Sequence, residues 1–159
     1  MARSQLGREP GPAVPDETSK RIIEQLQADG RRSYASIGKA VGLSEAAVRQ
    51  RVQRLADAGV MQIVAVTDPL TLGFRRQAMI AVKCDGDLEK LAAQLAEMDE
   101  IDYVVITAGS FDLLAEVVCE NDAHLLEILS RLRAVPSVTS TETFVYLKLC
   151  KQTYSWGTR

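Results

Sequence analysis

Side chains that can bind a polyanion are concentrated between residues 31 and 54. This stretch contains one acid, Glu45, and six basic residues: Arg31, Arg32, Lys39, Arg49, Arg51 and Arg54. A guanidinium group can hold a phosphate or donate two hydrogen bonds to a guanine edge, and a glutamine amide can pair with adenine. Clustered positive charge of this kind is typical of nucleic-acid binding, although a basic face that is merely solvated is the simpler alternative.

The same stretch is predicted to form two helices joined by a tight turn, which would position these side chains. Ser33 caps a helix over residues 34–41, and Ser44 caps a second helix that ends near Ala58. Gly42 lies between them, where a sharp turn calls for a positive φ that glycine adopts without steric cost. With a preceding helix over residues 15–28, these elements predict a winged-helix-like helix-turn-helix domain at residues 15–60.

The second helix of the pair has two different faces. Val48, Val52 and Leu55 recur at helical spacing and predict a buried stripe. The opposite face has small residues at its start and long polar side chains behind them, which suits a helix that enters the major groove. We therefore predict double-stranded DNA as a partner, with eight DNA-binding residues: Ser33, Ser44, Ala46, Ala47, Arg49, Gln50, Gln53 and Arg54.

Charge is divided unevenly along the chain, which indicates two modules. Residues 1–68 hold 10 Lys and Arg against 8 Asp and Glu, a net charge of +2, and residues 69–159 hold 9 against 13, a net charge of −4. A basic front joined to an acidic back is expected of a DNA reader joined to a module of another kind. We expect a disordered arm at residues 1–14, and a strand over residues 61–67 within a hinge linker at residues 61–74.

The second module reads as β-α-β-β-α-β. Strands are predicted over residues 77–84, 103–107, 113–119 and 141–150, and helices over residues 88–98 and 123–133. This order predicts a ferredoxin-like domain at residues 75–153 with a tail at residues 154–159, and an α+β class for the chain. The two helices should cover one sheet face, made of Ile80, Val82, Ala115, Val117, Val145, Leu147 and Leu149.

The opposite sheet face predicts self-association. It carries Lys83, Glu116 and Lys148 among apolar residues, namely Met79, Ala81, Leu114, Val118, Phe144 and Tyr146. A face this apolar is expected to be covered, so a homodimer through the sheet is predicted. A half-exposed face that the monomer tolerates is the alternative.

Other features argue against membrane insertion and catalysis. No run approaches about 18 apolar residues and no signal peptide is evident, so we expect a cytoplasmic protein without membrane contact. Cys84, Cys119 and Cys150 lack metal-binding spacing and are expected to be free thiols. The only histidine, His124, has no triad or metal partners in the sequence, so we predict no catalytic residue, no metal and no cofactor.

Four segments in order give the chain a family resemblance. They are DETSKRIIEQLQADGRRSYASIGKAVGLS, EAAVRQRVQRLADAGV, AGSFDLL and SVTSTETFVYL. The chain resembles the leucine-responsive regulatory protein/AsnC (Lrp/AsnC) family of transcription regulators over residues 15–153. The resemblance implies a sensor domain that responds to amino acids, and dimers that assemble further, often to octamers. The chain departs from the family pattern at Glu45, Ala46 and Ala47, where many members have proline or threonine. The resemblance therefore does not imply which DNA sequence is read.

The resemblance also implies an effector site between sensor domains of neighbouring dimers. The family's glycine-containing turn matches Gly109, Ser110, Phe111 and Asp112, and Thr139 and Thr141 supply hydroxyl groups nearby. Asp112 can pair with an α-ammonium group, although a β-turn with a capping aspartate is the alternative.

Together these features predict a sequence-specific transcription regulator whose assembly and DNA binding respond to a small effector, an amino acid. A sensor that has lost DNA binding is one alternative. A small metabolic enzyme is favoured less.

Overall fold

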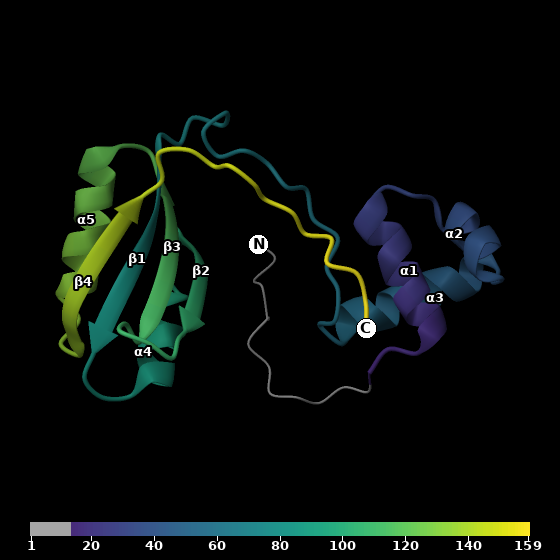
Figure 1. Cartoon of the computed structure of the whole chain (residues 1–159), viewed down its shortest axis with the longest axis horizontal. Helices are drawn as coiled ribbons and strands as arrows, with labels where there is room; N and C mark the ends of the chain where they lie inside the picture. Colours follow the sequence, from purple (N-terminus) through teal and green to yellow (C-terminus); the bar gives the residue numbers. More distant parts are fainter. Residues whose placement is uncertain (1–13) are drawn as a thin grey trace. The chain divides into compact units, whose positions relative to one another are not determined.

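The computed structural model describes residues 14–159, which form two compact units (Figure 1). The first contains the described residues up to Val66 together with Lys151–Arg159, and the second contains Thr67–Cys150. Residues 151–153 therefore group with the first unit, whereas the sequence placed them in the sensor domain. The predicted arm lies outside the described residues except for Val14.

The first unit is built around three helices, α1 (Glu17–Ala28), α2 (Tyr34–Val41) and α3 (Glu45–Asp57). Each begins after a capping side chain that accepts a hydrogen bond from a backbone N–H of the first turn, and the caps are Asp16, Ser33 and Ser44. Gly42 ends α2 with a φ of 76°, as predicted. The helices enclose one apolar core, made of Ile22, Leu26, Ile37, Val48 and Val52.

The C-terminal tail contacts the first helix of this unit. The Gly157 N–H donates to Gln27 Oε1 at 3.2 Å, and the Thr158 hydroxyl donates to Glu24 Oε1 at 2.6 Å. Gln27 and Glu24 lie one turn apart on α1, so the tail lies along one side of that helix. No position for the tail was predicted from the sequence.

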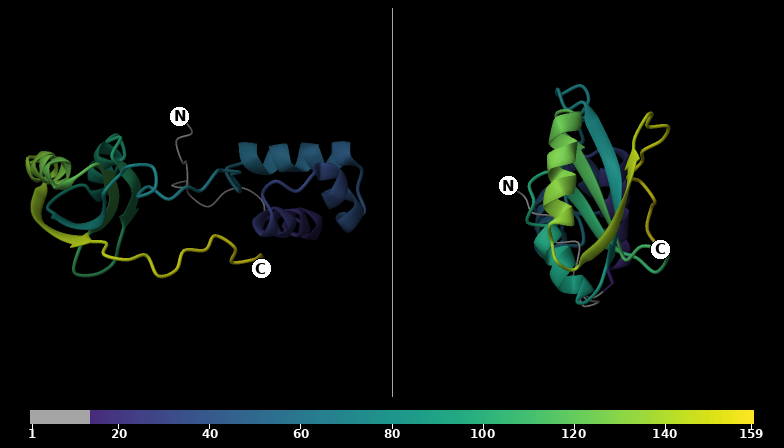
Figure 2. Two further views of the ribbon diagram at one scale, coloured as in Figure 1. Left: turned by 90° about the horizontal axis from the view of Figure 1, so that it is seen from above. Right: turned by 90° about the vertical axis from the view of Figure 1, so that its left-hand side faces the viewer.

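The second unit is a four-stranded antiparallel sheet with two helices on one face (Figures 1 and 2). Its elements are β1 (Arg76–Cys84), α4 (Leu88–Leu95), β2 (Ile101–Ile106), β3 (Leu113–Cys119), α5 (Asp122–Arg133) and β4 (Val138–Val145). The strand order is β2-β3-β1-β4. The predicted α+β class and ferredoxin-like β-α-β-β-α-β order are confirmed. The core between sheet and helices includes Ile80, Val82, Leu91, Leu95 and Ile128.

The last strand was predicted too late in the chain. It spans Val138–Val145 instead of residues 141–150. β4 pairs with β1 from Cys84↔Val138 to Ala78↔Val145, so β1 has almost run out where Val145 is reached. β4 is also the edge of the sheet, so it can pair only with β1. The Tyr146 N–H still donates to the Gln77 carbonyl oxygen at 2.9 Å, but the residues after Tyr146 have no strand partner within residues 14–159.

This register also corrects the predicted faces. Ile80, Val82, Ala115 and Val117 are buried beneath the helices as expected, but Val145, Leu147 and Leu149 are exposed. The prediction was wrong for these three because they lie at or beyond the end of the paired strand. On the opposite face, Ala81 is buried, whereas Met79, Leu114, Val118 and Tyr146 are half-buried and Phe144 is exposed. This apolar surface is called the open face below.

The strand predicted at residues 61–67 is not formed. Ile63, Val64 and Val66 are exposed, and the segment has no strand partner within residues 14–159. Alternating apolar residues favour an extended conformation, but a strand also needs a neighbouring strand to pair with its backbone N–H and C=O groups. Among the described helices, none is long and apolar enough to cross a membrane.

Candidate functional site

The turn before α3 fixes the start of that helix. The Ser44 Oγ accepts a hydrogen bond from the Ala47 N–H at 3.2 Å. A Cβ atom at Gly38 would lie 2.5 Å from the Leu43 carbonyl oxygen, so α2 and the turn approach closely only because residue 38 is glycine. The sequence pattern singled out Gly42 and missed this requirement at Gly38.

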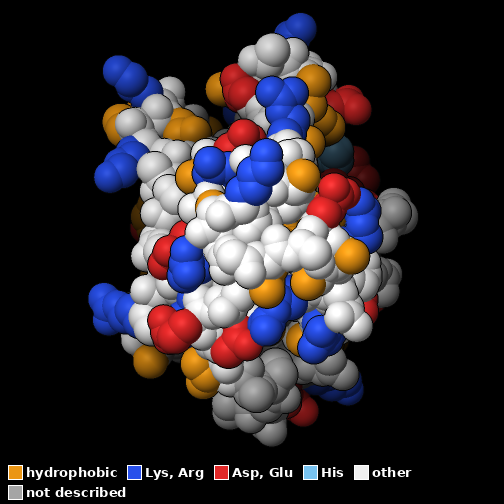
Figure 3. Space-filling model, turned by 90° about the vertical axis from the view of Figure 1, so that its right-hand side faces the viewer, with side chains coloured by type: hydrophobic (Ala, Val, Ile, Leu, Met, Phe, Trp, Pro, Cys, Tyr) orange, Lys and Arg blue, Asp and Glu red, His pale blue; other side chains and the backbone are white. Residues whose placement is uncertain are grey.

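Burial separates the two faces of α3 as predicted. Val48, Val52 and Leu55 are buried. Ala47 is half-buried, and the other seven predicted DNA-binding residues are exposed, namely Ser33, Ser44, Ala46, Arg49, Gln50, Gln53 and Arg54. Figure 3 views the first unit and shows blue Lys and Arg side chains spread over it with red carboxylates between them. The positive charge is therefore interrupted by acids instead of forming one unbroken patch.

The arginines of α3 differ in what they contact. Arg51 turns inward and donates to both carboxylate oxygens of Asp16, at 2.9 and 2.7 Å, and to Ser19 Oγ at 3.1 Å. The hydrogen bond from Arg51 is the main reason that the pKa of Asp16 is lowered to about 2. The Arg54 side chain makes no hydrogen bond or ion pair within residues 14–159 and remains available. Arg51 is thus a structural residue, and Arg32, another of the six basic residues that suggested DNA contact, also donates within the unit, to Gln25 Oε1.

A second candidate site lies at one end of the sheet, where β1 ends and β3 and β4 begin. The turn between β2 and β3 is closed by the Thr107 hydroxyl, which donates to the Phe111 carbonyl oxygen at 2.6 Å. Asp112 fastens this turn to β1, because its N–H donates to the Val82 carbonyl at 3.0 Å and its Oδ2 accepts from the Cys84 N–H at 2.9 Å. Asp112 therefore has a structural role whether or not it also binds a ligand.

Thr139 and Thr141, the predicted effector residues of β4, lie on the other side of the end of β1 from the turn. The Thr139 hydroxyl donates to the Lys83 carbonyl oxygen at 3.1 Å. The structure therefore brings the turn and the start of β4 to adjoining positions, with the last residues of β1 between them. Gly109 and Ser110 are exposed, and Phe111 and Asp112 are half-buried.

A pocket adjoins the start of β4. It has a volume of about 340 Å³ and is lined by Arg133, Val138, Thr139, Ser140 and Thr141. Arg133 Nε donates to Thr141 Oγ1 at 2.8 Å, which places a cation among hydroxyl groups. Sequence reasoning missed Arg133 because it ends α5, and its contact with β4 depends on how the helix packs beside the strand.

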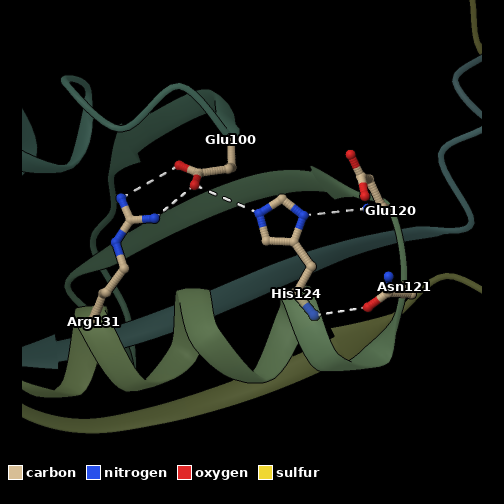
Figure 4. Close-up of polar contacts among 5 residues, drawn as sticks. All are labelled: Glu100, Glu120, Asn121, His124 and Arg131. Atoms are coloured by element: carbon tan, nitrogen blue, oxygen red, sulfur yellow. Dashed lines mark hydrogen bonds and ion pairs between the residues drawn. The ribbon is translucent and has the colours of Figure 1, made fainter.

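His124 belongs to an ion-pair cluster instead of a catalytic set (Figure 4). Its Nε2 lies 3.6 Å from Glu100 Oε1, and Arg131 Nη1 donates to the same oxygen at 2.6 Å. The hydrogen bond from Arg131 lowers the pKa of Glu100. Across residues 14–159, no group of His, Cys, Asp and Glu has the arrangement of a metal site.

The thiols lie in different environments. Burial raises the pKa of Cys84, which is half-buried, and of Cys119, which is buried. A raised pKa keeps a thiol protonated near neutral pH, so neither is set up as a nucleophile. All three cysteines are free, as predicted, and Cys150 is exposed.

Comparison with known proteins identifies the class of both units. Residues 16–56 match the AsnC-type helix-turn-helix domain, and residues 74–159 match a C-terminal dimeric α+β barrel domain of AsnC-type regulators. The chain is 34% identical over 140 residues to the HTH-type transcriptional regulator FL11 of Pyrococcus horikoshii, which covers 87% of this chain and 93% of that protein.

Solved structures agree with this assignment. The leucine response regulatory protein LrpA of Mycobacterium tuberculosis superposes with a TM-score of 0.80 at 26% identity, covering 87% of this chain and 96% of LrpA. A transcriptional regulator from Neisseria meningitidis in complex with L-Met gives a TM-score of 0.75 at 25% identity, covering 89% and 96%. A helix-turn-helix unit with exposed basic side chains, joined to this sheet, defines a DNA-binding transcription regulator. The chain belongs to the Lrp/AsnC family.

Proposed function

We propose that the outward face of α3, together with the capping residues Ser33 and Ser44, forms the surface that contacts DNA. The observation that carries this assignment is the separation of faces on α3, because the apolar side is buried while the long polar side chains are exposed. Each capping serine uses its oxygen as an acceptor within the helix, which leaves its hydroxyl hydrogen for a phosphate. Arg54 supplies an unpaired cation.

We further propose that an amino acid binds at the sheet end that carries Asp112 and Thr139. An amino acid offers a carboxylate and an ammonium group close together. The sheet end offers Asp112 Oδ1 for the ammonium, since Oδ2 already accepts from Cys84, and it offers backbone N–H groups near Gly109 for the carboxylate. The relative from Neisseria meningitidis was solved with L-Met, which makes methionine the first ligand to test.

The proposed assembly is a homodimer through the open face, with dimers joining into a larger ring such as an octamer around the effector sites. A ligand that binds one assembly more tightly than another shifts the equilibrium between them, and with it the spacing of the DNA-reading helices. A regulator of this kind acts on the chromosome, so we place it in the cytoplasm. We assign the chain no enzymatic step and no cofactor.

Two measurements test this function. Fluorescence anisotropy with genomic duplex fragments over a salt series should show tight binding whose affinity falls as salt rises. Thermal-shift screening of the amino acids, beginning with L-Met, should give a ligand whose affinity is then measured by calorimetry. A chain that binds no fragment at any salt concentration would reject the DNA-binding role and favour a sensor alone.

Variants at the effector site sharpen the second measurement. Asp112→Asn keeps an oxygen that can accept from Cys84 and removes the charge, so the fold should persist while the amino acid no longer binds. Asp112→Ala should lose ligand binding and also about 1 kcal/mol of stability, because the Cys84 N–H loses its acceptor. Asp99→Asn is the matched control, since Asp99 is an exposed carboxylate just before β2, at the other end of the sheet from the proposed site. Equal ligand affinity in Asp112→Asn and wild type would reject Asp112 as the ammonium partner.

A further inference from the structure

Arg49 is held from two sides on the exposed face of α3. Its Nη2 donates to Glu45 Oε1 at 2.9 Å, and its guanidinium carbon lies 5.2 Å from the centre of the Tyr34 ring. Glu45 is the first residue of α3 and stands one turn before Arg49 on the same side of the helix. Tyr34 comes from another element, because it is the first residue of α2.

Tyr34 anchors Arg49 to the core of the first unit. Its ring is half-buried and packs against the core of the first unit. A cation over the face of an aromatic ring is attracted by the electron density of the ring. The ring therefore fixes where the Arg49 head lies relative to the body of the domain, while Glu45 fixes how the head is turned.

The other two arginines of α3 are not held in this way. Arg51 turns inward to Asp16, and Arg54 has no partner within residues 14–159. Arg49 nevertheless stays accessible, since 64% of its side chain is exposed. Glu45 engages one nitrogen of a group that has five N–H donors, so the guanidinium keeps donors for a second acceptor.

We propose that Tyr34 and Glu45 are positioning residues that orient Arg49 to read one base pair, and that they set sequence preference instead of overall affinity. This inference rests on the proposed placement of α3 in the groove. An arginine side chain loses much rotamer freedom when it docks, and holding it in place beforehand removes part of that cost. Glu45 also neutralises the charge of Arg49, so the pair adds little to the attraction of phosphates that every DNA sequence shares.

The chemistry of the target follows from the side chains. A guanidinium that keeps two parallel N–H donors fits the O6 and N7 atoms of guanine in the major groove. The Glu45 carboxylate at the start of the same helix repels phosphates, which disfavours a docking position in which Arg49 contacts the DNA backbone. The preferred contact is therefore a G·C base pair at one position of each half-site.

The experiment is a selection of bound sequences from a random duplex library with the full-length chain, followed by anisotropy on the selected duplex and on a single-base variant of it. Arg49→Ala should reduce discrimination at one G·C position by about 5- to 150-fold, the range expected for one bidentate contact. Glu45→Ala and Tyr34→Leu should reduce discrimination at the same position, by at least about threefold, while binding to unselected duplex stays equal or rises in Glu45→Ala.

Controls separate positioning from stability. Tyr34→Phe retains the ring and should retain the base preference, which guards against misfolding of Tyr34→Leu. In an Arg49→Ala background, Glu45→Ala should have no further effect on discrimination, because Glu45 acts through Arg49. Arg54→Ala should leave the preference at this position unchanged.

Two outcomes would overturn the inference in distinguishable ways. If Arg49→Ala loses the preference but Glu45→Ala and Tyr34→Leu keep it, the contacts of Glu45 and Tyr34 with Arg49 do not position it for base reading, and the proposed function stands. If neither Arg49→Ala nor Arg54→Ala changes DNA binding, α3 is not in the groove and the DNA-contact surface itself is wrong.

Discussion

The two units expose surfaces of opposite character. On the first unit, the exposed face of α3 is polar, and acids interrupt its cations, as Glu45 does beside Arg49. On the second unit, the open face is largely apolar, although it includes Glu142 opposite Ala81 and Glu116, which accepts a hydrogen bond from Gln77 at 2.9 Å. Burial, together with the neighbouring Glu116 carboxylate, raises the pKa of Tyr146 on this face to about 12.

This difference has a physical consequence for binding. Association with DNA is governed by the release of counterions and weakens steeply as salt rises. Association of apolar surfaces is governed by removal of area from water and is insensitive to moderate salt. A salt series should therefore separate the two associations of this chain, because DNA binding should weaken as salt rises while dimerisation should change little.

The largest expected effect concerns the open face. Leu114→Arg places a charge without a partner opposite Ala81, and burying an unpaired charge costs about 3–5 kcal/mol, so dimerisation should weaken by about 100-fold or more. Light scattering should show a smaller species or an aggregate. Leu126→Arg is the matched control, because Leu126 on α5 is 64% exposed, and it should leave the mass unchanged. A wild-type chain that is monomeric at micromolar concentration would contradict the proposed interface.

An intermediate effect is expected on α3. Arg54→Ala should lower DNA affinity by about 1–3 kcal/mol if the side chain reads a base, and should reduce the salt slope by about one if it holds a phosphate. Unfolding should be unaffected, because Arg54 has no partner within residues 14–159. Arg51→Ala should instead lower the melting temperature, because it breaks the contacts with Asp16 and Ser19, and it should leave DNA affinity largely unchanged. Equal DNA binding by Arg54→Ala and wild type would count against the placement of α3.

The smallest effect should appear as a pH dependence. The pKa of Asp16 is lowered from 3.8 to about 2 in the folded chain, so its contribution to stability is present above the ordinary value and is lost as pH falls through about 2. Asp16→Asn retains an oxygen for capping α1 and removes the ion pair with Arg51. The melting temperatures of the two proteins should differ at about pH 5 and converge near pH 2. A difference that stays constant over this range would show that the ion pair does not stabilise the fold.

Local signals predicted the first unit well. Ser33, Ser44 and Gly42 mark the ends of α2 and α3 by chemistry that acts within a few residues, so the sequence alone locates them. The inward turn of Arg51 was missed because its partner, Asp16, lies 35 residues away in the chain.

The second unit depends on pairing between distant strands, and there prediction was weaker. Apolar alternation continues through Leu147 and Leu149, but pairing of β4 with β1 stops after Tyr146, where the start of β1 is reached. Nothing in the sequence near residue 146 indicates where β1 begins. The same long-range pairing places Thr139 beside Lys83, which lies 56 residues away in the chain. The effector-binding and DNA-binding residues remain predictions until they are mutated.

The tail has a practical consequence for anyone who purifies this protein. Thr158 and Gly157 bond to Glu24 and Gln27 on α1, so a peptide fused after Arg159 begins next to the DNA-binding unit although it follows the sensor in the chain. A polyhistidine tag after Arg159 would therefore add titratable charge next to α1 of the DNA-binding unit, and affinities should be measured after the tag has been cleaved.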